Sequence, residues 1–146
     1  VWLGVSAEDQ ARADERIPHL LETPAAVRFV SAEPLLGPVD FTRISSSPHG
    51  AMNALSLLPG ARRLDWIIVG GESGRNARPF DLAWARSLVQ QCHDAGVPCF
   101  VKQFGAFPTN GGGPGTIPTC IPGIRDRKGG DPAEWPEDLR IREFPR

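Results

Sequence analysis

The sequence lacks most of the features that would classify a protein at first sight. Its three cysteines form no CxxC pair, and their odd number argues against a disulfide framework or a self-contained zinc site. No apolar run approaches the roughly 20 residues that cross a bilayer, and no signal-type segment opens the chain. Its 16 basic and 17 acidic residues nearly cancel, so the net charge gives no attraction to nucleic acid. We therefore expect a soluble cytoplasmic domain without a membrane partner, and any nucleic-acid partner would need a local basic patch.

What is present is a series of short apolar runs rich in β-branched and aromatic residues. Each run is too short for a helix and lacks strict alternation, which is typical of strands buried on both faces of a sheet. The runs cover residues 1–5, 27–30, 66–69 and 99–101. The chain begins directly on the first run, so we expect its N-terminus to be truncated.

Helical segments lie between at least two pairs of these runs. Residues 8–22 form one, with Asp9 as a candidate N-cap. Residues 82–95 form a clearer one, with Asp81 as N-cap and Gly96 at its end. The longer link over residues 34–65 contains an apolar piece, residues 51–58, that we predict to form one or two helical turns.

Strand and helix in alternation predict an α/β fold with parallel strands and right-handed helical crossovers, either part of a barrel or an open doubly wound sheet. Four strands cannot close a barrel, so the sheet edges would need a missing N-terminal half or a second chain. We predict the C-terminal half of a TIM-type barrel in residues 1–104. Residues 105–146 would add a Pro/Gly-rich loop and a docking tail to the same domain.

Charged residues follow the ends of the predicted strands, where ligands bind in parallel α/β folds. Glu8, Glu33 and Glu72 follow the first three, and Lys102 ends the fourth. We predict catalytic roles for Glu33, Glu72 and Lys102, with Lys102 a buried ammonium paired with one of the two glutamates. Solvated loop charges and a purely structural ion pair are the alternatives.

The sharpest local motif is the glycine-rich segment that follows the third strand, Gly-Gly-Glu-Ser-Gly-Arg at residues 70–75. Consecutive glycines let backbone N–H groups approach a ligand and form an anion-binding nest, whereas the alternative is a tight turn. The histidines have no metal-ligand spacing, so we predict no metal site. The predicted binding residues for a small-molecule ligand are Gly70, Gly71, Glu72, Ser73, Arg75 and Arg78.

Five segments together carry a family resemblance: VWLGVSAE, FVSAEPLLGPV, DWIIVGGESG, FVKQFG and GGDPAEWPEDLRIREFP. They resemble a family of uncharacterised proteins from phages and prophages, whose full-length members begin with a three-cysteine motif like that of radical S-adenosylmethionine (SAM) enzymes. The resemblance implies a radical-SAM-like barrel, with a [4Fe–4S] cluster on an N-terminal CxxxCxxC-type loop and SAM across the strand ends. It makes the loop of residues 70–73, Glu33 and Lys102 candidates to hold cofactor or substrate.

Three functions remain open at this point. The first is a fragment of a radical-SAM-like enzyme, inactive alone because none of its cysteines has the cluster spacing. The second is a cluster-free barrel enzyme in which the glycine loop binds a phosphorylated or carboxylate ligand, while Glu33, Glu72 and Lys102 perform acid–base chemistry. The third is a non-catalytic phage or prophage factor that binds protein or nucleic acid through its loop and tail.

Overall fold

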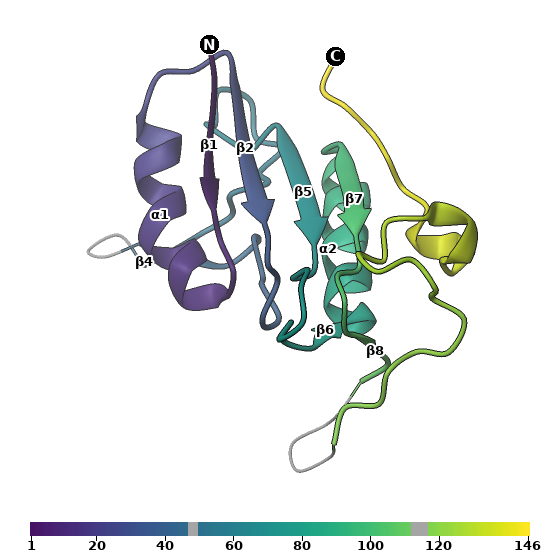
Figure 1. Ribbon diagram of the computed structural model, residues 1–146. Helices are drawn as coiled ribbons and strands as arrows, with labels where there is room; N and C mark the ends of the chain where they lie inside the picture. Colours follow the sequence, from purple (N-terminus) through teal and green to yellow (C-terminus); the bar gives the residue numbers. More distant parts are fainter. Residues whose placement is uncertain (47–49, 112–116) are drawn as a thin grey trace.

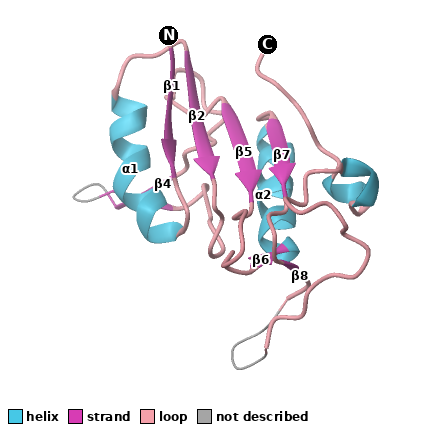
Figure 2. Ribbon diagram, viewed as in Figure 1, coloured by secondary structure: helices cyan, strands magenta, loops and turns pink. Residues whose placement is uncertain are grey.

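Four parallel strands form the central sheet of the protein, in the spatial order β1-β2-β5-β7 (Figure 1). The computed structural model describes residues 1–46, 50–111 and 117–146. The central strands are β1 (Trp2–Ser6), β2 (Val27–Ala32), β5 (Trp66–Gly70) and β7 (Cys99–Gln103). The other elements are α1 (Gln10–Glu22), β3 (Ile44–Ser46), β4 (Gly50–Met52), β6 (Phe80–Asp81), α2 (Leu82–Ala95) and β8 (Pro108–Thr109), followed by two short 3₁₀ helices, Pro132–Glu134 and Glu137–Leu139 (Figure 2).

Both predicted helices are present, and their ends have the predicted chemistry. The Asp9 carboxylate accepts a hydrogen bond from the Arg12 amide, and Asp81 accepts one from Ala83. Gly96 ends α2 in the left-handed conformation, with φ of 59°, which glycine adopts without steric cost. Helix α1 begins at Gln10 rather than at residue 8, because Asp9 acts as its cap.

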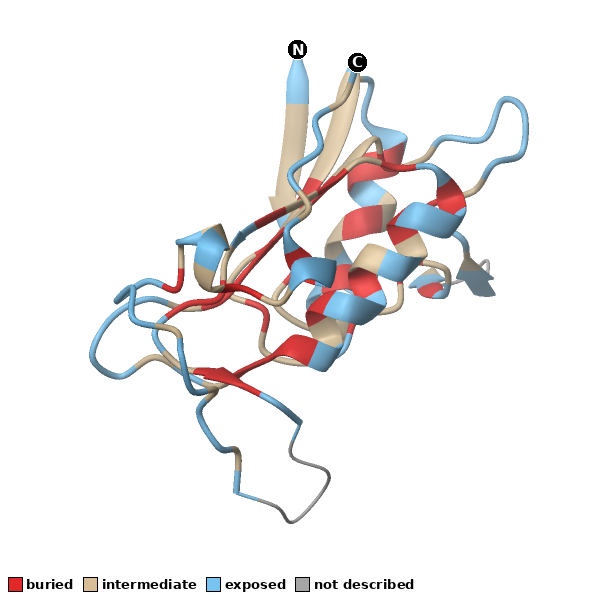
Figure 3. Ribbon diagram, turned by 90° about the vertical axis from the view of Figure 1, so that its right-hand side faces the viewer, coloured by how far each residue is buried: buried red, intermediate tan, exposed pale blue. Residues whose placement is uncertain are grey.

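Within the described residues, helices cover only one face of the sheet, which corrects the prediction of strands buried on both faces. Side chains alternate across each strand, and one set packs with the helices in the core, including Val30, Ile67, Val69 and Val101. Figure 3 shows both helices on the same side of the sheet. This arrangement follows from the strand order, since right-handed crossovers that advance in one direction stay on one face.

The opposite face, which we call the bare face, has an aromatic end and a polar end. Its side chains near the start of the strands form an aromatic network with ring centroids 5.1–6.1 Å apart. Ser6, Ser31 and Lys102 follow on the same face toward the carboxyl ends of the strands. The members of the aromatic network are Trp2, Phe29, Trp66, Phe100 and, from the tail, Phe144.

The C-terminal tail covers the β7 edge of the sheet. Val101 donates its amide to the Ile141 carbonyl (2.8 Å), and Glu143 donates to Cys99 (2.9 Å). The Trp135 ring is buried against Phe104, with centroids 4.5 Å apart. Within the described residues no strand pairs with the outer edge of β1, so one edge of the sheet carries free backbone groups.

The link between β2 and β5 differs from its prediction. Residues 51–58 form no helix: Gly50–Met52 pairs antiparallel with Ile44–Ser46, and the following residues make turns that bury Ala54 and Leu55. The predicted helical turns are therefore wrong: Ala54 and Leu55 reach the core from turns, whereas Leu57 and Leu58 are exposed.

The observed fold class is α/β with a parallel sheet, and the described strands close no barrel. No helix in the described part of the chain combines the length and the hydropathy that a bilayer span requires.

Candidate functional site

The carboxyl ends of the four parallel strands lie at one edge of the sheet, the lower edge in Figure 1. Glu33 and Lys102 form an ion pair there, with Lys102 Nζ 3.3 Å from Glu33 Oε1. The Ser31 hydroxyl donates a 3.0 Å hydrogen bond to Glu33 Oε2. The side chain of Lys102 is 54% exposed and that of Glu33 is 17% exposed. Lys102 therefore has one of its two predicted partners, but the prediction that it is buried is wrong.

The Glu33 carboxyl group packs directly against the backbone of Gly70. A Cβ atom at Gly70 would come within 2.8 Å of Glu33 Cγ and 2.9 Å of Glu33 Cδ. Neither Gly70 nor Gly71 has a positive φ, so the pair is not required for a left-handed turn. The first glycine is needed because a carboxylate passes directly over its backbone.

Gly71 is needed for a different close approach. A Cβ atom there would lie 2.6 Å from the Phe104 carbonyl carbon and 3.0 Å from the Gly105 nitrogen. The Gly71 amide already donates to the Gln103 carbonyl at 2.9 Å. Gly71 therefore serves backbone packing between the loop after β5 and the loop after β7.

Glu72 and Arg78 form a forked ion pair within the loop after β5. Arg78 Nε lies 2.8 Å from Glu72 Oε2, Arg78 Nη2 lies 3.0 Å from Oε1, and the Arg78 amide also donates to Oε2. Hydrogen bonds from this side chain and amide lower the pKa of Glu72 to about 2, and the same contact raises the pKa of Arg78. Each charge is neutralised by the other, and the ion pair orders the loop.

Ser73 and Arg75 line a separate cavity of about 710 Å³, together with Gly74, Ala106, Arg127 and Lys128. We call it the basic cavity. Its three cations are exposed, and none of them forms an ion pair in the described part of the chain. The cavity joins the loop after β5 to the loop that precedes the 3₁₀ helices.

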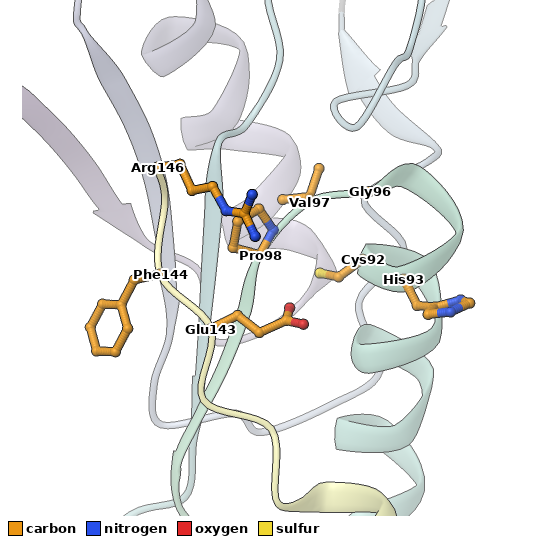
Figure 4. A pocket seen from close by; sticks show the side chains of 8 residues that line it. All are labelled: Cys92, His93, Gly96, Val97, Pro98, Glu143, Phe144 and Arg146. Atoms are coloured by element: carbon orange, nitrogen blue, oxygen red, sulfur yellow. The ribbon is translucent and has the colours of Figure 1, made fainter.

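A further cavity, of about 650 Å³, lies at the opposite end of the sheet (Figure 4). It is lined by the end of α2, the turn into β7 and the C-terminal residues; Phe144 points away from the other labelled side chains. Glu143 Oε2 there accepts the Cys99 amide at 3.0 Å. Ligands of parallel α/β folds bind at the carboxyl ends of strands, so this cavity is the weaker candidate.

The described residues contain no group of three or more His, Cys, Asp or Glu side chains able to hold a metal ion. Cys92 and Cys99 are buried beside each other, whereas Cys120 is exposed in a loop. A hydrogen bond with Cys99 and burial raise the pKa of the Cys92 thiol. Raised thiol pKa values disfavour the thiolates that iron–sulfur clusters require.

The predicted site residues thus fall into three neighbouring groups at one edge. These are the Glu33–Lys102 pair above Gly70, the Glu72–Arg78 pair beside Gly71, and the Ser73–Arg75 side of the basic cavity. Sequence reasoning missed three members, Ser31, Arg127 and Lys128. Ser31 could have been found from alternation along β2, whereas the two cations lie more than fifty residues from Arg75 in the chain.

Comparison with known proteins supplies a family. A family model described as a protein of unknown function, DUF5131, matches residues 1–134. No curated protein and no solved structure matches the chain. Because the matched segment includes every strand and helix of the central sheet, the chain belongs to the DUF5131 family.

Proposed function

We propose that this chain is the C-terminal half of a radical-SAM-like barrel protein of phages or prophages, and that it binds SAM at the carboxyl ends of its strands. The observation that supports the proposal is the bare face. It has an aromatic network near the start of the strands and the Glu33–Lys102 pair at their carboxyl ends. Parallel sheets are ordinarily covered on both faces, so this face calls for a further segment of protein or a second chain.

The charges of this edge fit one end of SAM. Its α-amino acid end carries an ammonium and a carboxylate, which Glu33 and Lys102 complement in sign. Its adenine ring has a flat face of the kind that stacks on aromatic side chains such as Phe29, which precedes Ser31 by two positions on the same face.

The cysteines of the chain do not fit an iron–sulfur cluster, since two are buried and the third lies apart from them. In this proposal the [4Fe–4S] cluster belongs to the missing N-terminal half, and the chain itself contributes binding only.

Titration calorimetry with SAM tests the proposal. We expect Glu33→Gln to weaken SAM binding about tenfold or more, the effect of losing a charged hydrogen bond. Glu15→Gln is the matched control, because Glu15 is an exposed glutamate paired with Arg12 on α1. Equal SAM affinity in both variants, or no binding to the wild-type chain, would overturn it.

A second candidate, the cluster-free enzyme acting on a phosphorylated ligand, is favoured by one observation, the basic cavity beside the same edge. In that case Glu33 and Lys102 would be the acid–base groups. Glu72 is the weakest of the predicted catalytic residues in either case, because both its oxygens are occupied by Arg78.

A further inference from the structure

The basic cavity has the features of a preformed anion site. Arg75 comes from the loop after β5, and Arg127 and Lys128 come from a loop more than fifty residues later. Three like charges repel one another when brought around one cavity, so a bound anion would relieve a cost that the fold already bears.

In the described part of the chain, the acids on these two loops form no ion pair with the three cations. Glu72 binds Arg78, and Asp126 Oδ2 accepts the amides of Lys128 (3.1 Å) and Gly130 (2.6 Å). Glu134 Oε2 accepts the amides of Arg125 (2.7 Å) and Asp126 (3.0 Å). The acids therefore order the two loops by accepting backbone hydrogen bonds. The three cationic side chains form none of these hydrogen bonds.

The two loops are also held together by their backbones. Ala106 donates its amide to the Glu72 carbonyl at 2.8 Å, and Gly105 donates to Lys128 at 2.9 Å. Gly129 approaches so closely that a Cβ atom there would lie 2.7 Å from the Gly105 oxygen. The walls of the basic cavity are thus positioned before any ligand arrives, which lowers the entropic cost of binding.

We propose that the basic cavity binds the phosphoryl groups of a phosphorylated small molecule, as a second ligand beside the strand-end site. Two arginine forks and one ammonium match the charge and the acceptor oxygens of a phosphate or diphosphate better than those of a single carboxylate. The cavity volume of about 710 Å³ suits a small molecule. The three cations line one cavity, whereas a nucleic-acid backbone is ordinarily bound by cations spread along a stripe. This site does not depend on Glu33 or Lys102, so it goes beyond the proposed role in SAM binding.

Inorganic pyrophosphate is the probe, titrated into the full 146-residue chain at low ionic strength. The double variant Arg75→Gln/Arg127→Gln is expected to weaken pyrophosphate binding at least tenfold. Arg43→Gln is the matched control, since Arg43 is also exposed and forms no ion pair in the described part of the chain. The double variant Arg75→Lys/Arg127→Lys keeps the charge and loses the forks, so intermediate affinity is expected; it also serves if the glutamine variant does not fold.

Three results would overturn the inference. One is unchanged pyrophosphate affinity in the Arg75→Gln/Arg127→Gln chain, and another is an equal loss in Arg43→Gln. The third is that the wild-type chain binds a single-stranded DNA oligonucleotide more tightly than pyrophosphate, and that the Arg75→Gln/Arg127→Gln variant loses this DNA binding. The basic cavity would then be part of a nucleic-acid surface. Glu33→Gln should leave pyrophosphate affinity unchanged, so failure here is separable from failure of SAM binding.

Discussion

Two adjacent glycines should respond very differently to the same substitution. In Gly70→Ala the new methyl group meets the Glu33 carboxyl group, the far end of a side chain that can rotate away. The cost in stability is then at most the value of a partly exposed ion pair, about 0.2–1 kcal/mol. In Gly71→Ala the methyl group meets the backbone of Phe104 and Gly105 on another loop, and such overpacking costs about 1–3 kcal/mol.

Urea unfolding followed by tryptophan fluorescence measures both free energies of unfolding. Gly37→Ala is the control, because its nearest neighbour would be Asp9 Cβ at 4.0 Å and its φ is not positive. The effects on SAM binding should have the opposite order. Gly70→Ala displaces Glu33, so it should weaken SAM binding more than Gly71→Ala does, despite its smaller cost in stability. Equal losses of stability in Gly70→Ala and Gly71→Ala would refute this description of the loop packing.

Other consequences of the structure can be measured independently. Glu72→Gln should lower the melting temperature at pH 7, and the gap from wild type should close as pH falls from about 4.5 to about 2, because the depressed pKa makes this stabilisation present only while Glu72 is ionised. Cys120 should react with a maleimide in the folded protein, whereas Cys92 should react only after unfolding, because it is buried and the pKa of its thiol is raised. Trp135→Ala should cost about 3–5 kcal/mol in urea unfolding by removing a buried ring stacked on Phe104. A melting-temperature difference between Glu72→Gln and wild type that does not change with pH would contradict the role given to Glu72. Rapid labelling of Cys92 in the folded protein would contradict its burial. A cost for Trp135→Ala below that of an ordinary surface substitution would contradict the packing of its ring on Phe104.

Local patterns in the sequence were sufficient for the elements of the sheet. Short β-branched runs predicted all four strands of the central sheet. The residues Asp9, Asp81 and Gly96 predicted helix ends, because capping depends on a few neighbouring residues. Strand-end placement also predicted that Lys102 would pair with Glu33 or Glu72, since parallel strands end at the same edge, and the partner is Glu33.

What the sequence could not provide depends on contacts between distant segments. Aromatic residues on the uncovered face remove the alternation that ordinarily indicates a strand covered on one face, so the bare face was not expected. The Gly70–Gly71 pair was interpreted as a nest for a ligand, whereas its contacts are with Glu33 and the backbone of Phe104. Arg127 joins Arg75 only because the loop that precedes the 3₁₀ helices packs against the loops after β5 and β7.

The central claim is that the carboxyl-terminal edge of the sheet is the ligand site, and backbone amide chemical shifts test it most directly. Addition of SAM to the ¹⁵N-labelled chain should shift the amides of Ser31, Gly70 and Lys102, and Glu33→Gln should suppress those shifts. Shifts confined to the cavity at the other end of the sheet, around Val97 and Glu143, or no shifts at all, would contradict the account.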